Sequence, residues 1–259
     1  MKFMCLGYMD DKQWESMSDS QREAMIAECM AYDAVLQKGG HWIGDGVALQ
    51  GAPAARTLRR REGETIVTDG PYAETKEFLG GFFVLEARDM NHAVELMSKH
   101  PGIRDGLFEI RPVDEKMGEH CKGPAGTSDS RAEGKIFICF AYVNEKTRSA
   151  MSRSEQERML GEYAAYGDVL RRYGSRVAGE ALQQASTAKT LRTRAGKLLV
   201  TDGPYAETKE QLGGFAAYRF TNMEQATEAW SNHPCLRAGD SLEIRPADEE
   251  FLARAQRVT

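Results

Sequence analysis

The chain repeats one pattern of hydrophobic and polar positions twice, and the second copy begins about 134 residues after the first. In the first copy, apolar residues recur every three or four positions from Met25 to Leu36, which predicts a helix with one apolar face. Runs of alternating or continuous apolar residues predict strands around it. The predicted elements of this copy are strands at 2–9, 56–61, 64–68, 81–87 and 107–112, helices at 19–38 and 90–99, and an irregular stretch after Gly39-Gly40.

The two copies correspond along their whole length. FMCLGY at 3–8 lies over FICFAY at 137–142, and EIRP at 109–112 lies over EIRP at 243–246. A period this long exceeds that of any solenoid, so each copy is expected to be a whole domain. The predicted boundaries are a first repeat at 1–113, a flexible polar Gly/Ser-rich linker at 114–134, a second repeat at 135–247 and a C-terminal tail at 248–259.

The order of elements in one repeat is β-α-β-β-α-β with an added hairpin, which is the ferredoxin-like plan. Such a unit has helices on one face of its sheet only, so the other apolar face needs cover. Two repeats in one chain provide this cover if their sheets pack face to face. The sequence therefore predicts an α+β protein in which two ferredoxin-like βαββαβ repeats form an intrachain dimeric α+β barrel. This pseudo-dimer leaves higher oligomers open.

The motif VTDGPYAETKE occurs at 67–77 and again, unchanged, at 200–210, and LGGF follows each copy. Asp-Gly-Pro after a β-branched strand end favours a turn, because Asp accepts from backbone N–H groups and Pro fixes the next φ. A turn does not require the charged residues that end both copies. We expect these charges to contact either the other repeat or a ligand.

This motif, with the closing EIRP and the first strand FMCLGY, resembles the DGPF motif of the YCII-related family. The resemblance covers nearly all of both repeats and implies a dimeric α+β barrel. Some relatives are encoded beside, or fused to, alternative sigma factors. A few resemble enzymes with a His–Asp pair, one of them a dehydrochlorinase of aromatic degradation. Their Asp precedes the Pro that ends the second helix, whereas His100 and His233 stand there in this chain, and neither first helix contains a His.

Composition narrows the class of protein. The chain is 41% hydrophobic and 28% charged with a net charge of −5, which is typical of a soluble protein and argues against nucleic acid or membrane as a partner. No apolar run has the length of a bilayer span, and the N-terminal residues predict a strand. The five cysteines include no CxxC pair, which indicates reduced thiols. We expect a cytoplasmic protein without a metal or nucleotide cofactor.

Alternation along the strands predicts a charged barrel interior. If Phe108 and Ile110 face the helices, then Glu109 and Arg111 face the opposing sheet. Buried charges are costly unless they are paired. The interior therefore forms either a pocket for a small polar or anionic ligand or a structural Arg–Glu pair across the sheets. The candidate ligand-binding residues on these strands are Arg59, Glu109, Arg111, Arg192, Glu243 and Arg245.

Candidate acid/base groups come from the motif and from the ends of the second helices. The predicted catalytic residues are Asp69, Glu74, His100, Asp202, Glu207 and His233. Each His is either a general base at the barrel mouth or a cationic residue favoured by the helix dipole. Glu28 and Glu162 border apolar stripes, where a carboxylate either has a raised pKa or extends to water.

Three further residues complete the candidate ligand-binding set, namely Lys76, Lys209 and Glu180. Glu180 stands where the first repeat has Val47, so the two repeats are expected to have unequal pockets. Two functions fit these patterns. One is a small-molecule enzyme of the isomerase, lyase or hydrolase type that uses acid/base groups. The other is a non-catalytic regulatory module that docks a sigma-factor-type partner.

Overall fold

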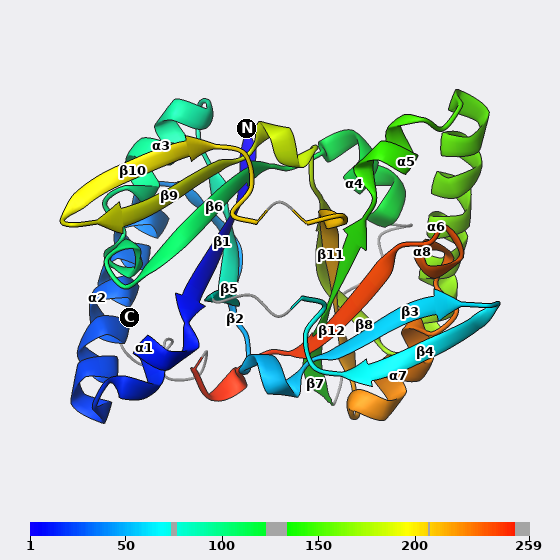
Figure 1. Cartoon of the computed structure of the whole chain (residues 1–259), viewed down its shortest axis with the longest axis horizontal. Coiled ribbons are helices and arrows are strands. Elements are labelled where there is room, and N and C mark those ends of the chain that lie inside the picture. The colour runs from blue at the N-terminus through cyan, green and yellow to red at the C-terminus, as the bar shows by residue number, and fades with distance from the viewer. Residues whose placement is uncertain (74–76, 123–133, 207, 252–259) are drawn as a thin grey trace.

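The computed structural model describes residues 1–73, 77–122, 134–206 and 208–251. Two six-stranded sheets lie in the middle of the molecule and the long helices lie outside them (Figure 1). The first half of the chain contains β1 (Lys2–Asp10), α1 (Asp11–Ser16), α2 (Asp19–Lys38), β2 (Trp42–Ala48), β3 (Arg56–Arg61), β4 (Glu64–Asp69), β5 (Glu77–Glu86), α3 (Met90–Met97), β6 (Gly106–Pro112) and α4 (Glu115–Lys122).

The second half repeats this order after α4. It contains β7 (Lys135–Val143), α5 (Glu145–Ser149), α6 (Arg153–Tyr173), β8 (Ser175–Ala181), β9 (Lys189–Arg194), β10 (Lys197–Asp202), β11 (Gln211–Phe220), α7 (Met223–Trp230), α8 (Pro234–Arg237) and β12 (Ser241–Pro246). Among the residues that the structure describes, no helix is long and apolar enough to cross a bilayer.

Local sequence signals fix the ends of the long helices. Ser18 and Gln21 form a reciprocal capping box at the start of α2, and Ser152 and Glu155 do the same for α6. These bonds satisfy backbone N–H groups that the first turn leaves without partners. Gly40 follows α2 with φ +72°, a conformation that glycine adopts without strain.

Each repeat has the ferredoxin-like strand order, and the sequence prediction of this fold is confirmed. The strands β6-β1-β5-β2 are neighbours in the first sheet, and β12-β7-β11-β8 are neighbours in the second. All pairings are antiparallel. The apolar face between the sheets is a continuous core that includes Met4, Leu6, Phe82, Ile138, Phe140 and Phe215.

The two repeats exchange their hairpins. The β3–β4 hairpin of the first repeat pairs with β12, and the β9–β10 hairpin of the second repeat pairs with β6 (Figure 1). The registers are equivalent, because Leu58 lies opposite Leu242 just as Leu191 lies opposite Phe108. The sequence predicts both hairpins but not their exchange.

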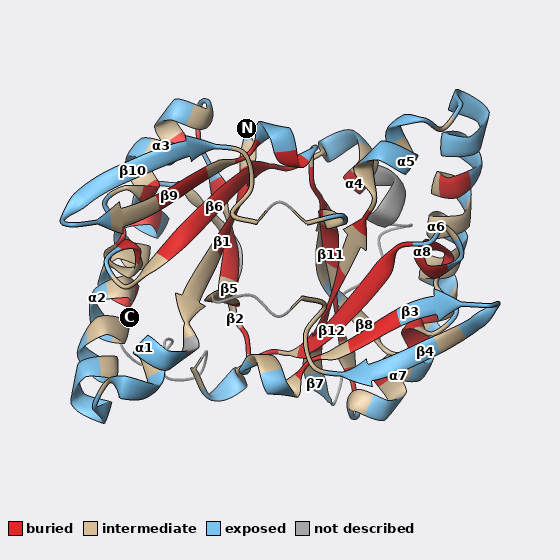
Figure 2. Ribbon diagram, in the orientation of Figure 1, coloured by how far each residue is buried: buried red, intermediate tan, exposed pale blue. Residues whose placement is uncertain are grey.

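Burial follows this arrangement. The strands in the middle of each sheet are buried, whereas the hairpin strands β4 and β10 are largely exposed (Figure 2). Two further cores lie between each sheet and its helices. The exchanged hairpins take part in these cores, since Leu58 packs in the core of the second repeat and Leu191 in that of the first.

Two predicted irregular segments contain regular structure. The stretch after Gly39-Gly40 forms β2, an edge strand with a register shift between Ile43 and Val47. Gly44 and Gly46 break its apolar pattern, which explains why the pattern predicts no strand here. The segment predicted as a linker begins with α4, which packs against α6 and β8.

Candidate functional site

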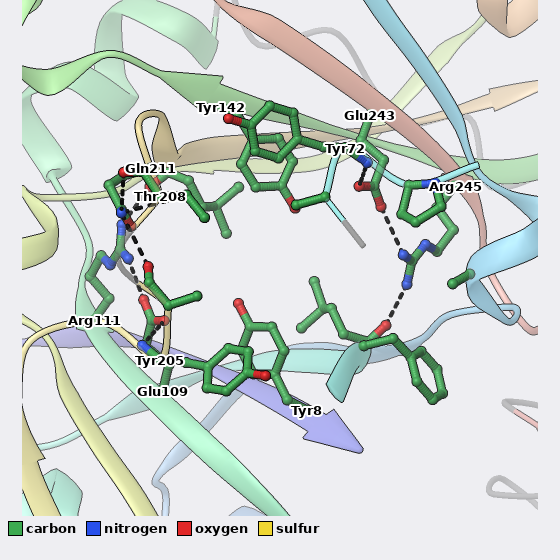
Figure 3. Close-up of a pocket in the computed structure, with 17 residues that line it drawn as sticks. Tyr8, Tyr72, Glu109, Arg111, Tyr142, Tyr205, Thr208, Gln211, Glu243 and Arg245 are labelled. Carbon is green, nitrogen blue, oxygen red and sulfur yellow. Dashed lines mark hydrogen bonds and ion pairs between the residues drawn. The ribbon is translucent and has the colours of Figure 1, made fainter. Parts of the chain in front are cut away.

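A cavity of about 210 Å³ lies between the two sheets. Equivalent residues of the two repeats lie on opposite sides of it, so that its wall is nearly symmetric (Figure 3). Its polar lining consists of Tyr8, Tyr72, Glu109, Arg111, Tyr142, Tyr205, Thr208, Gln211, Glu243 and Arg245.

The first charged side of the wall comes from β6. Phe108 and Ile110 point into the core beneath the helices. The intervening residues Glu109 and Arg111 therefore face the other sheet, as the alternation predicts. Arg111 is 1% exposed, forms an ion pair with Glu109 and donates from Nη1 to the carbonyl of Leu212 in the second repeat.

The second charged side comes from β12 and has the same geometry. Arg245 Nη2 lies 2.8 Å from Glu243 Oε1, and Arg245 Nη1 donates to the carbonyl of Leu79 in the first repeat. Each ion pair therefore joins two residues of one strand, and its arginine binds the backbone of the other repeat. This pairing offsets the cost of burying the charges.

The repeated motif is held by these same carboxylates. The backbone N–H of Tyr205 donates to Glu109 Oε2 at 3.0 Å, and that of Tyr72 donates to Glu243 Oε2 at 2.8 Å. Thr57 fixes the preceding turn by donating from its hydroxyl to the carbonyl of Gly70 at 2.9 Å. Each copy of the motif thus packs on the last strand of the other repeat.

The two motif copies also bind each other. The Tyr205 hydroxyl donates to Glu77, the last residue of the first copy. Tyr72 and Glu210 form the equivalent hydrogen bond. Burial and the bond to Glu77 raise the pKa of Tyr205 to about 12. Burial and the Glu210 charge raise the pKa of Tyr72. These contacts explain why the final glutamate of the motif recurs in both copies.

Two more tyrosines complete the wall. The ring of Tyr8 lies 4.8 Å from that of Tyr205, and the ring of Tyr142 stacks at 4.2 Å on that of Tyr72. Burial, together with nearby carboxylates, raises the pKa of Tyr8 and of Tyr142 well above the ordinary value. Both phenols therefore stay protonated at neutral pH. Among the described residues, neither hydroxyl has a hydrogen-bond partner.

Among the residues that the structure describes, the charges that line the cavity balance. Two guanidinium groups face two carboxylates, and each arginine is already paired. An anion would therefore gain little net attraction here. The hydroxyls of Tyr8 and Tyr142, which bond no described residue, offer hydrogen bonds, and the four tyrosine rings offer flat apolar faces. This chemistry suits a small neutral molecule with polar groups.

Arg59 and Arg192 lie elsewhere than predicted. Because their hairpins are exchanged, they flank the outer side of the motif and do not line the cavity. Arg59 is exposed, donates to the carbonyl of Tyr72 at 2.8 Å and lies 5.0 Å from the centre of its ring. Arg192 lies 5.8 Å from the centre of the Tyr205 ring. The expected inward orientation of both arginines is thus wrong.

The motif aspartates also lie away from the cavity. Asp69 is exposed at the end of β4 and binds Arg56 Nε at 3.2 Å. Asp202 is exposed at the end of β10 and pairs with Lys189. Both aspartates face solvent.

Neither histidine lies at the barrel mouth, where the sequence places a candidate general base, so this second expectation is corrected. His100 is buried on the helix side of the first sheet, where its Nε2 lies 3.1 Å from Asp33 Oδ1 on α2. His233 occupies the equivalent place in the second repeat. Burial and the charges of Arg148 and Arg237 lower its pKa to about 3. The first repeat thus holds a His–Asp pair, with the aspartate on the first helix.

The remaining candidates occupy varied positions. Glu74, Lys76 and Glu207 lie outside the described residues. Lys209 is exposed. Glu180 lies on β8 beside a second cavity on the helix side of the second sheet.

Glu28 and Glu162 sit at the edges of their helices. Glu28 pairs with Arg104, and Glu162 pairs with Arg158 at 2.9 Å and Arg237 at 3.3 Å. These contacts favour the structural interpretation of both glutamates.

Sequence reasoning missed the tyrosines and Asp33. A signal for the tyrosines exists, since Tyr8 and Tyr142 end the corresponding strands FMCLGY and FICFAY, and Tyr72 and Tyr205 belong to the repeated motif. Asp33 gives no such signal, because the second repeat has Gly167 in its place. Within the described part of the chain, no group of three or more His, Cys, Asp or Glu side chains is placed to hold a metal ion.

The fold and the cavity define a tandem ferredoxin-like protein with a small polar chamber between its repeats. The YCII-related domain matches residues 1–116 and 136–248, and the chain belongs to this family. An uncharacterized protein of Rhizobium meliloti (strain 1021) is 32% identical over 117 residues, which cover 44% of this chain and 92% of that protein.

Solved structures with a similar arrangement are distant in sequence. A putative chlorite dismutase covers 100% of this chain and 99% of its own, with 8% identity and a TM-score of 0.44. A chlorite dismutase from Candidatus Nitrospira defluvii has 11% identity, coverage of 98% and 94%, and a TM-score of 0.41. A heme-binding protein from Thermus thermophilus has 10% identity, coverage of 98% and 93%, and a TM-score of 0.42. Similarity at this level carries no information on ligand or activity.

Proposed function

We propose that the protein binds a small, neutral, hydroxyl-bearing molecule in the cavity between its sheets. The observation that supports this proposal is the pair of hydroxyls of Tyr8 and Tyr142, which line the cavity without a partner among the described residues. A tyrosine hydroxyl both donates and accepts, so a ligand that forms hydrogen bonds with these two groups gains affinity.

The size and shape of the cavity narrow the ligand further. A volume of about 210 Å³ holds several water molecules or one small ring compound. Paired tyrosine rings on two sides favour a flat molecule, since aromatic faces stack well on planar groups. A phenol or a similar one-ring alcohol satisfies both requirements.

We assign acid/base activity at this cavity to the tyrosine–glutamate pairs. Tyr205 with Glu77, and Tyr72 with Glu210, each join a phenol to a carboxylate across the two motif copies. The phenol can donate its proton to a bound substrate, and the carboxylate can take a proton from the substrate and return it to the phenolate. This assignment supports isomerase or lyase chemistry on the bound molecule.

Phenol and benzoate, which differ in charge, test the proposal by isothermal titration. We expect saturable binding of phenol and weaker binding of benzoate. The double variant Tyr8→Phe/Tyr142→Phe should bind phenol about fivefold more weakly for each hydrogen bond lost. Tyr173→Phe is the matched control, because Tyr173 lies at the end of α6, where it bonds Glu228 at 3.3 Å. Equal binding by the double variant and the wild type would refute the proposal.

A further inference from the structure

A second cavity lies in the second repeat. This cavity has a volume of about 120 Å³ and lies on the helix side of the second sheet, beneath α6, away from the chamber between the sheets. Its lining includes Arg148, Tyr163, Gly167, Arg176, Ala216 and His233. The corresponding side chains of the first repeat show why the space is open here.

Aromatic side chains fill this space in the first repeat. Trp42 on β2 stacks on Phe83 on β5, with the ring centres 4.1 Å apart. The strand registers place Arg176 at the position of Trp42, since Arg176 lies opposite Tyr218 as Trp42 lies opposite Leu85. The sequence repeat places Ala216 at the position of Phe83. The second repeat therefore lacks the two rings that would fill the cavity.

The half-buried His233 also lacks the carboxylate that His100 contacts. The Nδ1 atom of each histidine accepts a backbone N–H two residues later, at 3.1 Å in His100 and 3.2 Å in His233. The two rings are thus held in the same way, and Nε2 of His100 reaches Asp33 at 3.1 Å. Gly167 replaces this aspartate. Since Nδ1 accepts, neutral His233 carries its proton on Nε2, beside the space that a carboxylate fills in the first repeat.

Cationic groups surround that space. Arg148 is held by Asp240 and by the Tyr163 hydroxyl at 2.6 Å, yet its buried Nε donates to no described residue. Arg176 donates to the carbonyl of Gly179 at 3.1 Å and forms no ion pair with the acidic residues that the structure describes. Glu180 is the acidic residue of the lining. Among the described lining residues there are thus two arginines and one carboxylate, and Arg148 is already paired with Asp240.

We infer that this cavity binds a small organic anion whose carboxylate takes the place of the missing aspartate. The carboxylate would accept from His233 Nε2 and lie beside the guanidinium groups of Arg148 and Arg176. Its short apolar body would pack on Leu170, Leu242 and Trp230, which also line the cavity. The site is separate from the chamber between the sheets, so this inference does not depend on the proposed function.

Butyrate and butyramide, which differ in the charge of one group, test this inference on the full chain. Both are titrated while the side-chain ¹⁵N signals of the histidines are recorded, with His233 identified by its loss in His233→Gln. We expect butyrate to shift the His233 signals saturably and butyramide to leave them in place. The Tyr8→Phe/Tyr142→Phe variant should show the same butyrate response as the wild type.

The Gly167→Asp variant restores the carboxylate and should close the site. A Cβ atom at Gly167 would meet the end of the flexible Arg171 side chain at 3.5 Å, an ordinary contact, so the fold should tolerate the change. We expect butyrate binding to weaken by more than about tenfold. The matched control is Gly161→Asp on the same helix, where a Cβ atom meets nothing within 4 Å.

A second variant, Ala216→Phe, fills the cavity from the sheet side and should also abolish the butyrate response, with thermal unfolding measured to confirm a folded protein. Three results would overturn the inference: butyramide binding as tightly as butyrate, equal losses in Gly161→Asp and Gly167→Asp, or His233 signals that do not move at high butyrate. Loss of binding in folded Gly167→Asp and folded Ala216→Phe, but not in Gly161→Asp, supports it.

Discussion

Single residues acquire their roles from the other repeat. Tyr72 and Tyr205 occupy the same position of the repeated motif. Each is held by a glutamate on the last strand of the other repeat. The alternation of β6 and β12 predicts that Glu109 and Glu243 face inward, and the structure places them there. The tyrosine hydroxyls could not be placed in this way, because a period of two assigns a strand face but not a partner across the barrel.

The neutral state of His233 makes stability depend on pH. Its pKa in the folded protein is about 3, below the ordinary 6.5, because burial and two arginines oppose the charge. As pH falls below about 6.5, the unfolded chain binds a proton that the folded chain does not. Stability is therefore present above this pH and is lost toward lower pH, by roughly 1 kcal/mol per pH unit.

The comparison of wild type with His233→Gln isolates this effect. Urea unfolding at about pH 7 and about pH 5 gives the free energy of unfolding of both proteins. We expect the wild type to lose more stability than the variant between these two values. Parallel losses in the two proteins would show that His233 is protonated in the folded state.

At the scale of elements, local sequence patterns predict some helices and strands, whereas other strands form only through long-range contacts. The apolar stripe predicts the long helix of a repeat, and two short strand patterns on either side of Glu62-Gly63 predict the hairpin. The strand β2 is not predicted, because it survives as an edge strand only through its pairing with β5. The two glycines after the first motif serve both neighbours of β5, since Gly80 lies at a register shift between β1 and β5 and Gly81 lies against β2.

The approach of β2 to Gly81 gives a prediction on stability. A Cβ atom at Gly81 would lie 2.7 Å from the carbonyl oxygen of Val47, and a backbone atom cannot yield as a flexible side chain can. Gly81→Ala should therefore lower the free energy of unfolding by about 1–3 kcal/mol. Chemical denaturation measures the change.

The control for this substitution lies on an exposed helix surface. Gly161 on α6 has nothing within 4 Å of an added Cβ atom. Gly161→Ala should raise the free energy of unfolding by about 1 kcal/mol, because alanine favours a helix interior more than glycine does. Equal effects of the two substitutions would contradict the close contact between Gly81 and β2.

At the scale of the whole molecule, duplication supplies what one repeat cannot make alone. One repeat has an apolar sheet face without cover and a hairpin that belongs to another sheet. The sequence predicts the first need, since helices cover one face only. It cannot predict the second, because nothing local in β3 distinguishes pairing with β6 from pairing with β12.

The equivalence of the two exchanges predicts how one repeat behaves by itself. Leu58 lies opposite Leu242, and its counterpart Leu191 lies opposite Phe108, so two copies of the first repeat can exchange hairpins in the same register. A fragment of residues 1–113 should therefore form a homodimer that buries both sheet faces, because exposing so large an apolar face as a monomer is unfavourable.

Light scattering coupled to size exclusion tests this on the fragment, with the full chain as the reference. The dimeric fragment should have nearly the mass of the full chain and a similar elution volume. The variant Leu58→Asp should abolish the dimer, since its charge would enter the core beneath the helices of the partner copy. A folded monomeric fragment would show instead that β3 and β4 can return to their own sheet, and that the exchange depends on the connection between the repeats.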